Sequence, residues 1–369
     1  MRLLNIFDIP PNSYIASNVY TSNGGMLLKE NTPVTDKIIK ILEKQEIYSV
    51  YITDELSEKI KEELQLENEF DLKDVIDPVI RRKFNLSLKE SISTFKKVKG
   101  LSSFSTDGEQ LLNQVDSISK GIISEIMTKK ERRISLVDVK HLDVYDYEHA
   151  LNTAILSIVI GLGMGFLEKE LEYMAQASLL MNISNELLNP LLTGKDVNLS
   201  EEDYSVIKSH PELSRKLLSD NTKANAFVKN IVLKHHERMD GSGYPHGLKS
   251  SEIDKYTKIV MIADVYDALT ADRSYRKAFT PNEALEYIMG PSNLFDYESA
   301  FVFSRHIVPY PPGELVELSG GSLALVLNNN DQMPLRPIVR VIVGINRNEI
   351  IDLKTRRNIV INKRVTNIV

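Results

Sequence analysis

The chain has 369 residues, 42% of them hydrophobic and 26% charged, which is enough for two or three globular domains with real cores. Its formal net charge of −6 argues against nucleic acid as the main partner. It contains no cysteine, so disulfides and thiolate metal sites are excluded. Any transition metal must therefore be held by histidine and carboxylate.

Targeting signals are absent from the N-terminal stretch "MRLLNIFDIPPNSY", which has no sustained apolar run and no small-residue cleavage site. The longest nearly apolar run, "AILSIVIGLGMGFL" (154–167), is too short to span a bilayer and is more typical of a buried helix. We therefore expect a cytoplasmic protein without a membrane span.

Residues 1–55 predict a small β-rich accessory module with one helix. An Asn-Gly-Gly turn between the apolar runs of "YIASNVYTSNGGMLLKENT" indicates a hairpin. "TPVTDKIIKILEKQEI" predicts an amphipathic helix with Thr35 or Asp36 as N-cap, and "YSVYIT" predicts a closing strand. Residues 56–135 are charged and helix-periodic, with a break near 100–110, and we expect a helical connector.

Residues 136–308 predict a helical domain, because apolar residues recur at helical spacing in one segment after another. "TPNEALEYI" opens one helix with Thr280 as N-cap, Pro281 in the first turn and Glu283 closing a capping box. Residues 309–369 alternate short β-branched runs with Gly, Pro and Asn turns and predict a C-terminal β-unit. The fold class is therefore mainly α, flanked by small β-rich modules at both ends.

The helical domain also holds a scattered set of imidazoles and carboxylates: His149, His210, His235, His236, Asp240, Asp264 and Asp267. A lone histidine on an apolar helix is more often a core or surface residue than a ligand. The stretch "KHHERMDGSGYPHGL" (234–248) favours a ligand-binding role for its histidines, since its glycines and proline make a rigid loop that brings backbone close to a ligand.

Asp264 and Asp267 lie three residues apart and so share one face of their helix. A structural interpretation pairs them with the following "DRSYRK" segment as caps or ion pairs. A functional interpretation makes them metal-binding carboxylates, with Arg273 and Arg276 clamping a phosphate. The residues alone leave both interpretations open.

These motifs resemble those of the HD-GYP phosphodiesterases of the HD hydrolase superfamily. "HHERMDGSGYP" has the family's HHExxDGxGYP element at every fixed position, and "IADVYDALTADRSYR", "YEHALNTAIL" and "IKSHPELSRKLL" are similar to its other signature helices. The resemblance covers about 136–310 and implies an HD-type helical bundle. It also implies metal-dependent hydrolysis of cyclic di-GMP through a water that bridges the metal ions.

Carried onto this chain, the resemblance implies metal ligands at His149, His210, His235, His236 and Asp264, with Asp264 and His235 also in catalytic roles. The metal would be iron or manganese. The implied substrate-binding residues are Arg273 and Arg276, together with the loop residues Gly241, Gly243, Tyr244 and Pro245.

The chain departs from the family pattern in "LLMNISNELL". Met181 stands in place of the eponymous His, Asn182 in place of the Asp that bridges two metals, and Asn185 in place of a Lys. Asn offers no charge, and the Met thioether is poorly matched to Mn or oxidised Fe. Tyr145 stands where trinuclear members carry a Glu, so we expect one or two ions rather than three.

Two functions follow from these residues. The first is a working cyclic di-GMP phosphodiesterase with an unusual metal site. The second is a catalytically degenerate protein that binds cyclic di-GMP, or a diguanylate cyclase of the GGDEF type, and acts as an effector. The family resemblance favours the phosphodiesterase, with the effector as the alternative. The sequence leaves open whether the chain turns over its substrate, whether the product is a linear dinucleotide or GMP, what the N-terminal module senses and whether the chain forms a homo-oligomer.

Overall fold

The computed structural model describes residues 2–21, 25–45, 47–55, 57–58, 75–97, 106–129, 145–185, 200–271, 278–290 and 293–365. Two compact units make up the chain: one comprises Val75–Ile134 and Tyr145–His306, and the other Met1–Asp74, Ser135–Val144 and Ile307–Val369. Among the described helices, none combines the length and the apolar character that a bilayer crossing requires.

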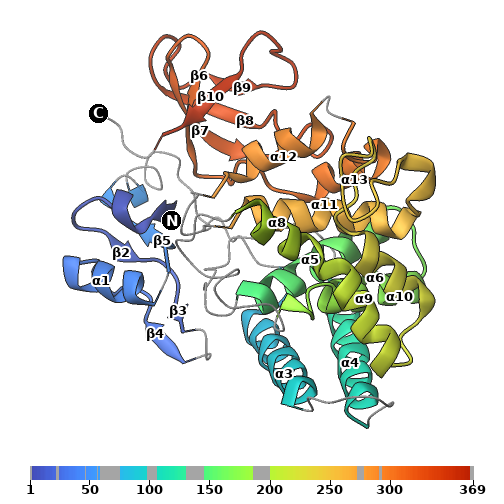
Figure 1. Ribbon diagram of the computed structural model, residues 1–369. Helices are drawn as coiled ribbons and strands as arrows, with labels where there is room; N and C mark the ends of the chain where they lie inside the picture. Colours follow the sequence, from blue (N-terminus) through green and yellow to red (C-terminus); the bar gives the residue numbers. More distant parts are fainter. Residues whose placement is uncertain are drawn as a thin grey trace. The chain divides into compact units, whose positions relative to one another are not determined.

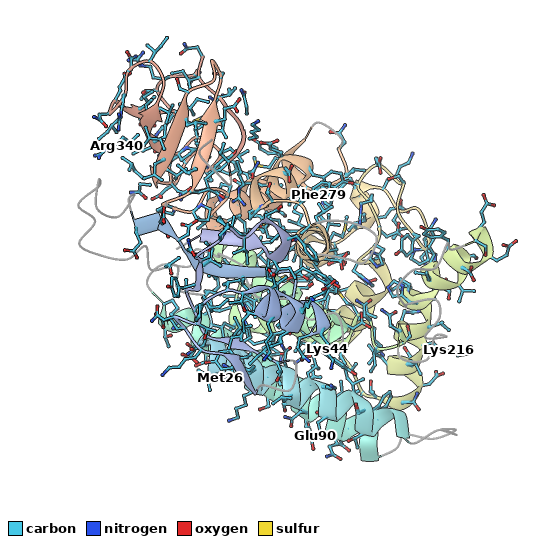
Figure 2. The ribbon with its side chains drawn as sticks, turned by 90° about the vertical axis from the view of Figure 1, so that its left-hand side faces the viewer. Met26, Lys44, Glu90, Lys216, Phe279 and Arg340 are labelled. Carbon is cyan, nitrogen blue, oxygen red and sulfur yellow. The ribbon has the colours of Figure 1, made fainter. Side chains whose placement is uncertain are left out.

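The larger unit is helical (Figure 1). Its helices are α3 (Pro78–Lys97), α4 (Thr106–Thr128), α5 (Tyr145–Gly163), α6 (Glu168–Leu180), α8 (Glu201–Lys208), α9 (His210–Asn221), α10 (Ala226–Lys234), α11 (Lys255–Leu269), α12 (Pro281–Met289) and α13 (Tyr297–His306), with a 3₁₀ turn at Ser250–Glu252. Side chains such as Glu90 on α3 and Lys216 on α9 are exposed on its surface (Figure 2). The predicted fold class, mainly helical with small β-rich modules at both ends, is confirmed.

Helix α5 forms the centre of this unit and packs against α4, α6, α11 and α13. It has no exposed polar face: its residues from Leu151 to Ile160 are all buried, including the polar Asn152, Thr153 and Ser157. A helix without a polar face must be covered on all sides, which explains why the longest apolar run of the chain is a core helix. One end of α5 carries His149, so the core helix also fixes a candidate ligand.

Two helix boundaries differ from a simple periodic interpretation. "EEDYSVIKSHPELSRKLLSD" forms α8 and α9, which meet at Ser209, because Pro211 has no N–H to donate to the carbonyl of Ile207. Helix α10 ends at Lys234, so the two histidines that follow lie at its C-terminal end rather than inside a continuous helix. The expected cap at Thr280, with Pro281 in the first turn and Glu283 closing the capping box, is confirmed.

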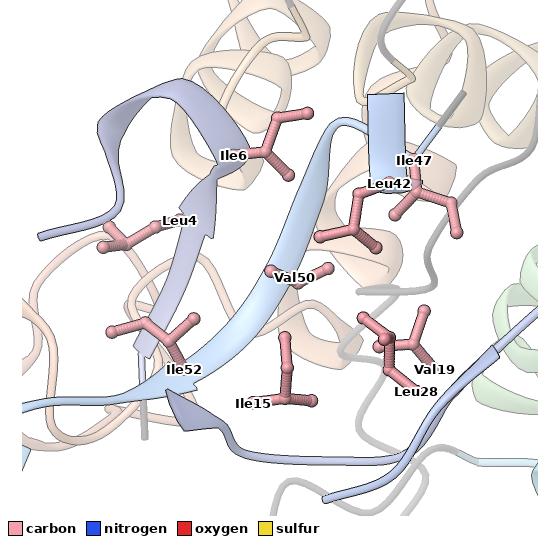
Figure 3. Close-up of a cluster of buried hydrophobic side chains, with 9 residues drawn as sticks. All are labelled: Leu4, Ile6, Ile15, Val19, Leu28, Leu42, Ile47, Val50 and Ile52. Carbon is pink, nitrogen blue, oxygen red and sulfur yellow. The ribbon is translucent and has the colours of Figure 1, made fainter. Parts of the chain in front are cut away.

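The N-terminal module has an antiparallel sheet of order β1-β5-β2, formed by Arg2–Asn5, Ser49–Thr53 and Tyr14–Ile15. Strands β3 (Val19–Tyr20) and β4 (Met26–Leu28) form the predicted hairpin, and α1 (Asp36–Lys44) starts at the predicted cap Thr35. A 3₁₀ turn, Ile6–Asp8, follows β1. Figure 3 shows the buried core that these elements share: Leu4, Ile6, Ile15, Val19, Leu28, Leu42, Ile47, Val50 and Ile52.

The C-terminal module is a five-stranded antiparallel sheet of order β10-β6-β7-β8-β9. Its strands are β6 (Leu315–Leu318), β7 (Leu323–Asn328), β8 (Ile338–Val343), β9 (Ile350–Asp352) and β10 (Ile361–Arg364). Alternate residues of these strands, including Val326, Val339 and Val341, point into one buried cluster. The predicted C-terminal β-unit is therefore present, with the alternation that a half-buried sheet requires.

Candidate metal centre

Three histidines of the helical unit converge on one point. His210 begins α9, while His235 and His236 follow the last residue of α10. One nitrogen from each of the three lies within 4.8 Å of the others. His235 is fully buried, His210 is nearly so, and His236 keeps 19% of its side-chain surface exposed. The cluster therefore opens to solvent on the side of His236.

Backbone carbonyls near two helix ends orient the rings of His210 and His235. Nδ1 of His210 lies 2.8 Å from the carbonyl oxygen of Ile207, which Pro211 leaves without its usual donor. Nδ1 of His235 lies 2.8 Å from the carbonyl oxygen of Val232, one of the last carbonyls of α10. A ring that donates its Nδ1 proton presents a lone pair at Nε2.

The Nε2 atoms of His210 and His235 lie only 3.3 Å apart. Two lone pairs at that distance repel each other unless a proton or a cation lies between them. Burial lowers the pKa of His210, lowers that of His235 to about 3, and places the pKa of His236 well below its ordinary value. The three imidazoles are therefore neutral near pH 7, the state in which imidazole binds metal. The donor set fits a transition-metal ion.

A second cluster adjoins the first. His149 lies between two carboxylates of α11, with Nε2 3.0 Å from Asp264 and Nδ1 2.8 Å from Asp267. The other oxygen of Asp264 is 3.5 Å from Nδ1 of His236, so Asp264 links the two clusters. The amide of Asn152, one turn along α5 from His149, donates to Asp267 at 2.9 Å.

The charges of this second cluster are coupled. Burial disfavours a charged His149, but the hydrogen bonds and charges of Asp264 and Asp267 outweigh it and raise its pKa to about 9. Burial would likewise raise the pKa of Asp264, yet the imidazoles of His236 and His149 bring it well below the ordinary value. A positive charge between the two carboxylates is thus strongly favoured, and a proton on His149 supplies it here.

The loop 236–248 is held by Glu237, a fully buried side chain. Its two carboxylate oxygens accept from the backbone N–H groups of His246 and Leu248, each at 2.8 Å. A Cβ on Gly243 would come within 2.4 Å of the Glu237 backbone, so only glycine fits there. Gly241 has a φ of +87°, which also favours glycine.

Tyr244 belongs to the same loop and stacks on His236, with ring centroids 4.7 Å apart and planes 27° from parallel. The peptide bond between Tyr244 and Pro245 is cis. Burial raises the pKa of the Tyr244 phenol above its ordinary value, so this side chain stays neutral. The glycine-rich loop therefore places a neutral aromatic ring against the exposed face of the metal-ligand candidate His236.

The altered segment 181–185 lies next to His210. Met181 is completely buried at the end of α6. The hydroxyl of Ser184 donates to the carbonyl oxygen of His210 at 2.9 Å and accepts from Ser214. Asn182 accepts the N–H of Asn185 through its backbone carbonyl. Met181, Asn182 and Asn185 thus belong to a segment hydrogen-bonded to the start of α9.

Of the other sequence-predicted residues, Arg273 and Arg276 lie outside the described residues, and Asp240 bonds locally to Ser242 rather than to the clusters. Sequence reasoning missed the parts played by Glu237, Asn152 and Ser184. Glu237 is a fixed position of the signature loop, and this could have indicated a structural role for its side chain. Asn152 follows His149 by one turn, a spacing that by itself indicates only a shared helix face.

Two family models match the chain. Residues 122–298 match one described as an HD domain, and residues 315–368 match one described as a KOW domain associated with an HD domain. The chain contains an HD domain. The HD-type domain expected from the sequence is thereby found at residues 122–298, and the C-terminal β-unit matches a module named for its association with such domains.

Curated relatives extend this similarity. A cyclic di-GMP phosphodiesterase of Pseudomonas aeruginosa is 30% identical over 62% of this chain and 54% of its own length. One from Borreliella burgdorferi is 28% identical over 54% of this chain and 52% of its own. A 3′3′-cGAMP-specific phosphodiesterase of Vibrio cholerae is 27% identical over 41% of this chain and 32% of its own. The chain thus spans about half the length of the first two relatives, or less for the third.

Proposed function

We propose that this HD domain is a metal-dependent phosphodiesterase that hydrolyses cyclic di-GMP. The observation that carries the proposal is the convergence of three neutral imidazoles, two of which direct Nε2 lone pairs to atoms 3.3 Å apart. The names of the curated relatives support the substrate class, since each acts on a cyclic dinucleotide.

We assign one ion to His210, His235 and His236, and a second to His149 and Asp264. When bound, such ions supply Lewis-acid chemistry, polarising a phosphoryl oxygen and acidifying water. Iron or manganese is the metal we expect. Binding of a second ion would displace the proton of His149, because the same nitrogen now faces Asp264.

The chain's own residues then have distinct tasks. The carbonyls of Ile207 and Val232 hold two imidazoles in the tautomer that binds a cation. Asp267 keeps His149 oriented from behind. Glu237 fixes the loop that carries Tyr244, whose ring covers His236 on the exposed side. These contacts hold and orient the candidate ligands.

Met181 and Asn182 favour a second function, a cyclic di-GMP-binding effector with little turnover. A buried thioether and a neutral amide supply no charge to hold two ions together. Such a protein would act through ligand binding or through a GGDEF-type diguanylate cyclase partner. The phosphodiesterase and the ligand-binding effector both predict binding of cyclic di-GMP, and they differ in turnover and in metal content.

Restoring the altered dyad separates these two functions. We would compare wild type with Met181→His/Asn182→Asp, and with the triple variant that adds Asn185→Lys. Metal per chain and hydrolysis of cyclic di-GMP and 3′3′-cGAMP would be measured after anaerobic loading with Fe or Mn. An enzyme gives turnover in wild type; an effector gives turnover only after restoration, with a gain on the order of a thousandfold. Absence of ligand binding in every protein, each loaded with metal, would refute both the phosphodiesterase and the ligand-binding effector.

A further inference from the structure

Two cationic residues lie within two sequence positions of the cluster histidines and have no part in the metal sites assigned above. The first is Lys208, the last residue of α8, two positions before His210. Its ammonium group lies 5.9 Å from the centroid of the Tyr244 ring, and that ring stacks on His236. Lys208 is exposed, so its charge faces solvent at the open side of the cluster.

The second is Arg238, two positions after His236. Its guanidinium lies over the ring of Phe295, 5.5 Å from the centroid, and Nη1 donates to the carbonyl oxygen of Glu237 at 2.7 Å. Its backbone packs against Gly243, the residue before Tyr244. The next residue, Met239, donates its N–H to the carbonyl of Leu294 at 3.0 Å, which ties the loop to the Phe295 segment.

Neither cation has a carboxylate within 4.0 Å among the residues that the structure describes. Other lysines of the same unit are paired: Lys255 lies 2.7 Å from Glu170, and Lys120 lies 2.7 Å from Asp116. An exposed lysine at the Tyr244 ring and an arginine on the loop that follows His236, each without such a carboxylate among the described residues, are suited to bind an anionic ligand.

We propose that Lys208 and Arg238 together bind the phosphates of the ligand at the open side of the three-histidine cluster. The inference rests on the proposed function and deepens it, since a cyclic dinucleotide carries two phosphodiester charges. One phosphate at the metal centre leaves the second to be bound by side chains outside it.

The two cations contribute differently. Arg238 is held by an aromatic face and a backbone carbonyl, so its remaining N–H groups form a preorganised fork for phosphate oxygens. Lys208 is an exposed point charge that must be ordered when it binds. We therefore expect removal of Arg238 to weaken binding more than removal of Lys208.

The test uses the full chain loaded with Mn and measures calorimetric affinity for two probes, cyclic di-GMP and bis(p-nitrophenyl) phosphate. The variants are Lys208→Gln, Arg238→Gln and their combination. Lys216→Gln is the matched control, because Lys216 is an exposed cation on α9 (Figure 2). We expect about tenfold weaker binding for Arg238→Gln, a smaller loss for Lys208→Gln, and no change for the control. Metal per chain should not change, and the salt dependence of binding should fall.

Each result decides something. Equal affinity of the double variant and wild type for a probe that wild type binds would overturn the inference. So would failure of the Mn-loaded wild type to bind either probe, or equal losses in Lys216→Gln. Binding of the simple diester that depends on both cations, without binding of cyclic di-GMP, would support the inference and refute the proposed substrate.

Discussion

Asp264 and Asp267 differ by one turn of helix and by what their oxygens face. Asp264 reaches both His149 and His236, whereas Asp267 faces the far nitrogen of His149 and the amide of Asn152. The first is placed to bind an ion and the second to orient a ligand. Their shared helix face was visible in the sequence, but this division of roles was not, because it depends on where α5 crosses α11.

Replacement of Asp267 tests that division. Asp267→Asn keeps the shape but weakens the hold on Nδ1 of His149, and we expect metal affinity or activity to fall about 10- to 100-fold. Metal titration followed by elemental analysis measures the change, and circular dichroism should report an intact fold. Asn152→Ala, which removes the amide that donates to Asp267, should give a smaller loss of metal affinity. Unchanged metal affinity in Asp267→Asn would show that Asp267 does not orient His149 for metal binding.

The signature loop makes a second prediction at this scale. In Gly243→Ala the new methyl group would meet the backbone of Glu237 and Arg238 at 2.4 Å, and neither can move without disturbing the Glu237 carboxylate. We expect a destabilisation of about 1–3 kcal/mol and loss of ligand binding. Ser242→Ala, at the exposed neighbouring position, is the control and should leave stability nearly unchanged. Equal denaturant midpoints for the two variants would contradict this account.

At the scale of elements, the ends of helices position the candidate ligands. Local signals predicted several of these ends: Thr35 and Thr280 are capping residues with the expected hydrogen bonds. The end of α10 at Lys234 could not be predicted in the same way, because the histidines continue the helical pattern. It depends on tertiary contacts, since the loop that follows is held by Glu237 and by Leu294.

Glu170 joins the starts of α6 and α11. It accepts from Lys255 at 2.7 Å, from the N–H of Leu167 at 2.8 Å and from the Tyr256 hydroxyl at 2.9 Å. The Lys255 and Leu167 hydrogen bonds are the main causes that lower its pKa from 4.5 to about 2. A lowered carboxylate pKa stabilises the fold above the unfolded-state value, and that stability is lost as pH falls from about 4.5 through about 2.

We therefore expect Glu170→Gln to lower the free energy of unfolding by about 1 kcal/mol at neutral pH, the small value reflecting an exposed lysine partner. The difference from wild type should shrink as pH falls below 4.5. Urea unfolding at a series of pH values measures both. Glu168→Gln changes an exposed carboxylate of the same helical turn and serves as control. A difference that stays constant down to pH 2 would assign the effect to something other than this charge.

At the scale of the whole molecule, the order of β-rich, helical and β-rich segments was predictable, because residue periodicity changes sharply along the chain. The boundaries at 55, 135 and 308 remain predictions. The meeting of His149, from α5, with three histidines some sixty to ninety positions later required a family pattern, since nothing local in those helices indicates it. Arg273 and Arg276 likewise keep the roles that the resemblance implies.

The N-terminal module has its own core, and this permits a prediction that is local to it. Leu42 is fully buried among Ile47, Val50 and their neighbours (Figure 3), so Leu42→Ala should cost about 2–5 kcal/mol. Amide exchange should accelerate in β1 and β5, with metal per chain unchanged. Met26→Ala, at a side chain that is 57% exposed, is the control. Loss of metal in Leu42→Ala would show that this core also supports the metal centre.

The three-histidine cluster has a consequence for which element the protein will carry. Its donors are neutral nitrogens, and among the described residues no carboxylate, the ligand that would favour harder ions, completes the group. Affinities of such nitrogen sites rise from manganese through iron to copper, with zinc also bound tightly. The ligands therefore do not select manganese or iron by strength of binding. The ion recovered with the protein should therefore depend on the supply of metal in which the chain folded.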